Sequence, residues 1–96
     1  MYKNTCLLYH GITEVYEKLR IYCFNKGFKV KKSSEKYYFI MARKRSIFIW
    51  KNLRLQLKIV AVEKRAEVTI KIYKLGLRQR KLENEYCIEN ENLFKS

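Results

Sequence analysis

The hydrophobic positions first follow a helical period. In the stretch ITEVYEKLRIYCFNKG, residues 12–27, apolar side chains recur three and four residues apart, which predicts an amphipathic helix. Thr13 is the predicted N-cap, and Gly27 is the predicted C-terminal stop. The preceding stretch KNTCLLYH has the apolar content of a short strand. The apolar positions that define the helical stripe are Ile12, Val15, Tyr16, Leu19, Tyr22 and Cys23.

After this helix the period changes to two. FKVKK (28–32) alternates, SSE (33–35) indicates a turn, and KYYFIMAR (36–43) is apolar on both faces, which is typical of a central strand. LRLQLKIVAV (53–62) and EVTIKIY (67–73) alternate most clearly and are separated by the turn EKRA. The remainder, from residue 75, is predicted as a helix whose start Gly76 weakens. Its predicted apolar stripe comprises Leu75, Leu82, Tyr86 and Leu93.

This order of elements predicts an α+β fold in one small domain spanning residues 1–96. Successive strands joined by short turns favour antiparallel pairing, so we expect a mainly antiparallel sheet of four to five strands. A helix in the N-terminal half and a C-terminal helix should pack on one face of this sheet. Residues 82–96 could form a less firmly packed, acidic helical tail.

Charge adds a functional indication to this fold. The chain has 22 Lys and Arg residues against nine acidic residues, and its formal net charge is +13. Between residues 18 and 58 there are thirteen cations and a single carboxylate, Glu35, so this stretch carries a net +12. Such asymmetry indicates a polyanionic partner, for which nucleic acid and an anionic membrane are the candidates.

Residue types that carry out catalysis are scarce. The chain contains one His and three Gly residues, and none of its nine acids is an Asp. Nucleotide-binding loops, nucleophile elbows and sites that need two or more His residues are therefore excluded within one chain, and we expect a non-enzymatic protein without cofactor or metal. Cys6 and His10 supply at most half a metal site. The cysteines at positions 6, 23 and 87 are predicted to be buried free thiols.

The proposed binding residues lie on the predicted sheet and its turns. Alternation turns Arg54, Gln56 and Lys58 away from the core, a pattern suited to phosphate contact. We predict DNA or RNA as the partner, bound through its backbone; a merely solvated basic surface is the alternative interpretation. The predicted phosphate contacts are Arg43, Lys44, Arg45, Lys51, Arg54 and Lys58, followed in a second tier by Lys29, Lys31 and Lys71.

Aromatic residues within the basic region have two interpretations. Tyr37 and Phe39, or Tyr38 if the other face of the strand is open, could stack on unpaired bases together with Trp50. Alternatively they belong to the core, which is the usual place of aromatic side chains. The sequence alone does not decide which face of the strand at residues 36–43 is open.

Two other classes of function remain as alternatives. The acidic segment 83–91 could screen the basic sheet or bind that of a second copy. The alternative function is therefore an assembly module that forms homo-oligomers or binds an acidic protein partner, with no nucleic-acid role. Peripheral membrane binding through RKR and IFIW is less favoured, because the chain lacks an amphipathic basic helix. No apolar run approaches the roughly 18 residues of a membrane span, and the first residues do not resemble a secretory signal, so we expect a cytoplasmic protein.

Overall fold

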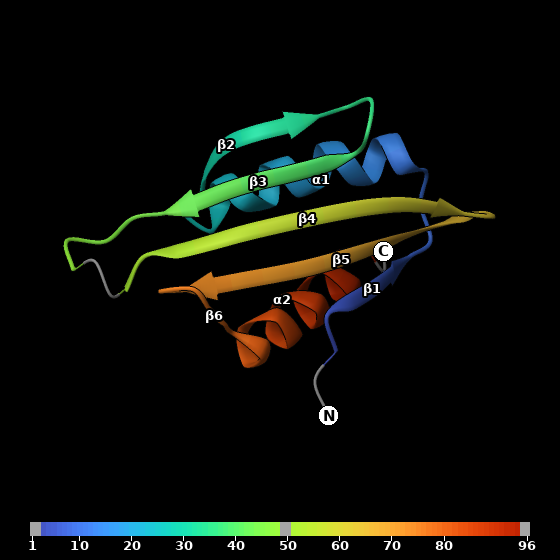
Figure 1. Cartoon of the computed structure of the whole chain (residues 1–96). Helices are drawn as coiled ribbons and strands as arrows, with labels where there is room; N and C mark the ends of the chain where they lie inside the picture. Colours follow the sequence, from blue (N-terminus) through green and yellow to red (C-terminus); the bar gives the residue numbers. More distant parts are fainter. Residues whose placement is uncertain (1–2, 49–50, 95–96) are drawn as a thin grey trace.

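The fold is a six-stranded antiparallel sheet with two helices, which confirms the predicted α+β class (Figure 1). The computed structural model describes residues 3–48 and 51–94. In chain order the elements are β1 (Thr5–Leu8), α1 (Ile12–Asn25), β2 (Lys29–Ser34), β3 (Phe39–Lys44), β4 (Leu53–Val62), β5 (Arg65–Lys74), β6 (Leu77–Arg78) and α2 (Arg80–Leu93).

The sheet is built around one long hairpin. β4 and β5 pair over nearly their whole length, from Arg54 opposite Tyr73 to Val62 opposite Arg65. β3 and β2 extend the sheet on the β4 side, and β1 and β6 both pair with the far side of β5, which gives the order β1-β5-β4-β3-β2. β2 and β1 therefore lie at opposite edges, and β4 lies at the centre.

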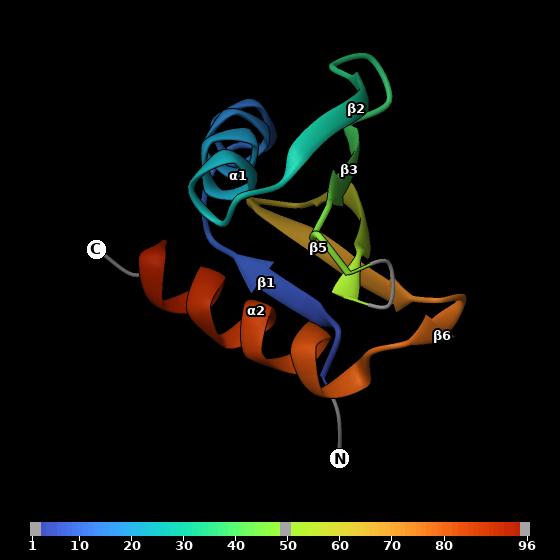
Figure 2. The ribbon, with the colours of Figure 1, turned by 90° about the vertical axis from the view of Figure 1, so that its left-hand side faces the viewer.

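Both helices cover the same face of the sheet, as the side view in Figure 2 shows. Alternation along β4 and β5 turns one set of apolar side chains toward the helices, and this set is buried from Leu55 to Ile59 of β4 and from Ala66 to Ile72 of β5. Val15 and Leu19 of α1, with Tyr86 and Cys87 of α2, close the core from the helix side. Neither α1 nor α2 lies on the opposite face of the sheet (Figure 2). The buried strand residues are Leu55, Leu57, Ile59, Ala66, Val68, Ile70 and Ile72.

Two boundaries differ from the sequence prediction. α1 begins after Gly11, which occupies the N-cap position, rather than after Thr13. The turn that follows β2 covers residues 35–38, so β3 begins only at Phe39. Tyr38 has a backbone φ of 52°. This left-handed conformation is incompatible with a strand. The predicted strand at residues 36–43 therefore cannot include its first residues.

The structure differs more from the sequence prediction in the C-terminal part, from residue 75 onward. Leu75 and Gly76, with φ of 53° and 79°, form a two-residue hairpin turn to β6, where a helix was predicted. α2 starts only at Arg80, and the predicted stripe is wrong at Leu75 and Leu93, which are both largely exposed. The residues that α2 buries are Glu83, Tyr86, Cys87 and Asn90.

Gly27 offers a test of how α1 ends. Its φ of +85° is unfavourable for any residue with a Cβ, although the nearest side chain, Lys44, leaves room for a methyl group. We expect Gly27→Ala to lower the free energy of unfolding by about 1 kcal/mol, because alanine is strained in this conformation. Urea denaturation measures this change. Gly27→Asn is the control, since asparagine tolerates a positive φ better than alanine does, and an equal loss in both variants would contradict the explanation.

Candidate nucleic-acid interface

The helix-free face of the sheet carries rows of cations across neighbouring strands. Lys29 of β2 lies opposite Arg43 of β3, which lies opposite Arg54 of β4. The next row runs from Lys32 through Met41 and Gln56 to Lys71. We call this surface the basic face; its charged members are Lys29, Lys31, Lys32, Arg43, Arg54, Lys58 and Lys71, with Arg45 at one end and Glu67 as the carboxylate among them.

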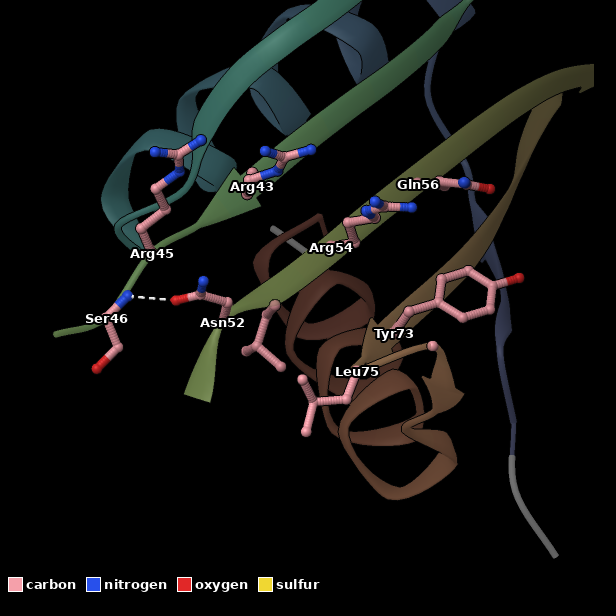
Figure 3. A pocket seen from close by; sticks show the side chains of 10 residues that line it. Arg43, Arg45, Ser46, Asn52, Arg54, Gln56, Tyr73 and Leu75 are labelled. Atoms are coloured by element: carbon pink, nitrogen blue, oxygen red, sulfur yellow. Dashed lines mark hydrogen bonds between the residues drawn. The ribbon is translucent and has the colours of Figure 1, made fainter. Parts of the chain in front are cut away.

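One end of the basic face is hollowed. A depression of about 720 Å³ lies between the ends of β3 and β4 and the turn after β5. Figure 3 shows the guanidinium groups of Arg43, Arg45 and Arg54 around it, with Tyr73 across the depression. The backbone N–H of Ser46 donates a hydrogen bond of 2.7 Å to the Oδ1 atom of Asn52, which joins the two ends of the connection from β3 to β4.

The depression continues along the sheet as a groove. A second hollow of about 580 Å³ lies near the other end of β3 and is lined by Tyr37, Phe39, Met41, Gln56, Lys58, Thr69 and Lys71, among others. A third, of about 300 Å³, shares Met41 and Gln56 with the second hollow and Arg43 and Arg54 with the first. We call the three hollows together the sheet groove. It follows β3 and β4 over roughly six residues, or about 20 Å.

The cations of the basic face have no ion-pair partner among the described residues. Among residues 3–48 and 51–94, all ion pairs involve α1, α2 or the segments beside them, and none involves a cation of the basic face. The positive charges of Lys29, and then of Arg45 and Arg43, contribute to lowering the pKa of Lys31. Like charges directly opposite on neighbouring strands destabilise a sheet, so this surface favours a bound anion.

Seven of the nine residues predicted from the sequence lie on the basic face or at its end. Lys44 does not: its ammonium group lies 5.9 Å from the ring centroid of Phe28, a residue of the helix-covered side. Alternation along β3 explains this, because Lys44 follows Arg43 and must point the opposite way. Lys51 lies in the connection to β4, over the ring of Phe48.

The aromatic residues that were candidates for stacking on bases lie on different sides of the sheet. Tyr38 packs edge-on against Tyr16 of α1, so it belongs to the helix-covered side. Tyr37 is 66% exposed, and both Tyr37 and Phe39 line the sheet groove. Trp50 lies outside the described residues. The sequence analysis did not include Tyr73 among the candidate residues. In the alternation of residues 67–73, however, Tyr73 follows the outward-facing Thr69 and Lys71 and so belongs to the open face.

The acidic segment does not cover the basic face. Glu83 pairs with Arg78, Glu89 with Lys26, and Glu91 with Lys3, all on the helix side or at the β1 edge. The idea that this segment screens the basic sheet within one molecule is therefore wrong for the structure described. At the other edge, β2 has a register shift between Val30 and Lys32 and carries several lysines, features that oppose edge-to-edge pairing.

The two candidate metal ligands, Cys6 and His10, contact different groups. Cys6 lies beside Cys87, with 2.8 Å between the two sulfur atoms. His10 hydrogen-bonds the carbonyl oxygen of Phe94 at 2.7 Å and lies 3.3 Å from a carboxylate oxygen of Glu14. Within the two described ranges, no three His, Cys, Asp or Glu side chains are grouped to hold a metal ion.

Comparison with models of known protein families gives no match, and comparison with curated proteins gives none either. Neither of the described helices, α1 or α2, is long and apolar enough to cross a bilayer.

Proposed function

We propose that this protein binds nucleic acid through the phosphate groups, with the basic face as the binding surface. The observation that carries the proposal is the row Lys29, Arg43 and Arg54, which lie opposite one another on three strands without a carboxylate partner among the described residues. Cations held at such spacing gain most from a ligand that presents several anionic groups in sequence, as a phosphate backbone does.

The chemistry of the groove supports the same ligand. Arginine guanidinium groups bind phosphate through paired N–H donors, and three of them surround the larger hollow. Gln56 and Asn52 add uncharged donors and acceptors. We assign phosphate contacts to Arg43, Arg45, Arg54 and Lys58, with Lys29, Lys31 and Lys71 as further contacts. Lys44 and Lys51, which were predicted from the sequence as contacts, have a weaker case because they lie off the basic face.

The test is a binding titration by fluorescence anisotropy. Labelled single- and double-stranded DNA and RNA of equal length are titrated with protein between about 50 and 200 mM salt, the range over which phosphate-binding proteins lose affinity most clearly. For a single strand we expect the logarithm of the binding constant to fall with the logarithm of salt with a slope of about −5, as the seven assigned contacts of about 0.7 each would give.

Two results would contradict the proposal. One is the absence of binding to every nucleic acid at the lowest salt. The other is clearly tighter binding to anionic lipid vesicles than to any of the oligonucleotides, which would indicate that the cations and the exposed Ile47 and Phe48 serve a membrane surface instead.

A further inference from the structure

Resting on the proposed function, we infer that the ligand is single-stranded and that the sheet groove holds its bases against Tyr37 and Phe39. The lining of the hollow of about 580 Å³ combines these two aromatic side chains with Met41, an exposed thioether. Lys58 and Lys71 belong to the same lining. An apolar floor flanked by cations fits a ligand that presents flat rings and phosphates together.

The position of the aromatic residues favours unpaired bases over a duplex. In a duplex the faces of the bases are covered by stacking, so only the phosphates and the groove edges can reach a protein surface. Tyr37, in the turn before β3, has two thirds of its surface exposed, and Lys36 lies 5.4 Å from its ring centroid. An exposed ring beside cations is the arrangement on which single-stranded bases stack.

The course of the groove supports a strand lying along β3 and β4. Arg43 and Arg54 line the larger hollow at one end, and Tyr37 and Phe39 line the hollow at the other. Gln56 lines all three hollows and can exchange hydrogen bonds with the edge of a base between them. Phosphate contacts at one end and stacking at the other would hold successive nucleotides of one strand.

The experiment compares three probes of equal length: a single-stranded oligothymidylate, the same backbone with abasic sites at every position, and a duplex. The abasic strand keeps the phosphates and removes the bases. We expect the oligothymidylate to bind at least roughly tenfold more tightly than the abasic strand, as removal of a stacking contact predicts. Tyr37→Ala should reduce this difference, whereas Tyr9→Ala, which removes a similarly exposed tyrosine outside the groove, should not.

Failure of this inference is distinct from failure of the proposed function. Equal binding of the thymidylate and abasic strands, or tighter binding of the duplex than of either strand, would overturn base stacking and leave phosphate binding intact. No binding of any probe at low salt would overturn both. Thermal unfolding of each variant, measured by circular dichroism, shows whether a loss of binding reflects a loss of fold.

A second proposal rests on a different observation, the contact between Cys6 of β1 and Cys87 of α2. We propose that these two cysteines form an internal disulfide when the protein meets a small-molecule disulfide such as oxidised glutathione. Their sulfur atoms are 2.8 Å apart, and both side chains are fully buried. A disulfide bond has a length of about 2.0 Å, so the atoms need to approach by less than about 1 Å.

The surroundings hold the two cysteines in place. Lys3 Nζ donates a hydrogen bond to Glu91 at 2.6 Å, and the backbone N–H of Lys3 donates one to Asn84. These bonds join the segment just before β1 to α2 at residues on both sides of Cys87. Oxidation proceeds by two exchanges. Because both thiols are fully buried, the first exchange takes place while β1 is locally separated from α2. One cysteine thiolate then attacks oxidised glutathione and releases one glutathione thiol; the other attacks the mixed disulfide and releases the second. The two protons of the cysteines end on the released glutathione.

Mass spectrometry after alkylation tests the disulfide directly. After equilibration with oxidised glutathione, the denatured protein should incorporate one iodoacetamide group, at Cys23, and the reduced protein should incorporate three. The oxidised form should melt roughly 10 °C higher, because the bond closes a loop of about 80 residues. Three alkylated cysteines after oxidation, or a disulfide that includes Cys23, would overturn the proposal. Cys23→Ala, which alters an equally buried thiol, should still form the bond.

Discussion

Replacing Arg43, Arg45 and Arg54 together by alanine should weaken nucleic-acid binding roughly 100-fold at about 0.1 M salt, which corresponds to about 1 kcal/mol for each lost phosphate contact. The slope of log affinity against log salt should become shallower by about 2, because three phosphate contacts no longer release counterions from a single strand. Both changes follow from the position of the three guanidinium groups around one hollow (Figure 3). Anisotropy titrations over salt measure them in one series.

A charge-matched variant separates local contact from net charge. Arg20, Arg80 and Lys81 are exposed residues of α1 and α2, on the other layer of the molecule, and their replacement by alanine removes the same three charges. We expect the salt slope of this control to stay close to that of the parent protein. If the two triple variants lose affinity equally, the effect belongs to the overall charge and not to the basic face.

Glu83→Ala should lower the free energy of unfolding by about 3 kcal/mol, the loss expected when one partner of a buried ion pair is removed. The carboxylate of Glu83 is almost fully buried and accepts three hydrogen bonds, from Arg78 Nε at 2.7 Å, Arg78 Nη2 at 2.9 Å and the backbone N–H of Ile72 at 2.8 Å. The last bond fills a gap at the edge of β5, between the segment paired with β1 and the segment paired with β6. Urea denaturation measures the loss.

The pH dependence gives this prediction a second readout. Burial alone raises the pKa of Glu83, but the hydrogen bonds from Arg78 and Ile72 outweigh it and hold the pKa below its usual value of 4.5. A lowered pKa in the folded state means that this contribution to stability is complete above the unfolded pKa and disappears as pH falls through the folded one. The difference in stability between the parent protein and Glu83→Gln should therefore shrink below about pH 4.5.

Glu85→Ala is the matched control for both measurements. Glu85 is a residue of the same helix, α2, but its carboxylate is exposed to solvent. Its removal should change the free energy of unfolding by less than about 0.5 kcal/mol. An equally small effect of Glu83→Ala would show that the carboxylate contributes little to the joining of α2 and the sheet.

The sequence predicts the sheet well where a single physical rule decides the structure. Residues 53–59 alternate between apolar and polar because one face of β4 packs against helices and the other is open, and the predicted bounds of the strand, 53–62, are confirmed. The rule fails in the C-terminal part. β6 depends on Leu75 at a positive φ, which local composition disfavours, and α2 buries Glu83 and Asn90, which a search for apolar stripes passes over.

The candidate site was also predicted only in part from the sequence. Period-two alternation was enough to assign Arg54, Gln56 and Lys58 to the open face, and it also separates Lys44 from Arg43 once the start of β3 is known. The assembly of the sheet groove could not be predicted, because it depends on which strands are neighbours. Tyr37 reaches the groove from a turn, whose side-chain direction no periodicity determines.

Chemical-shift mapping by NMR tests the central claim, that the basic face is the binding surface, most directly. Backbone amides of ¹⁵N-labelled protein are followed while a single-stranded oligonucleotide is added. The account predicts that the largest shifts fall on β3 and β4, at residues such as Arg43, Arg54 and Lys58, and that the amides on the outer surfaces of α1 and α2 stay nearly unchanged. Largest shifts on the two helices, or no shifts at an excess of oligonucleotide, would contradict it.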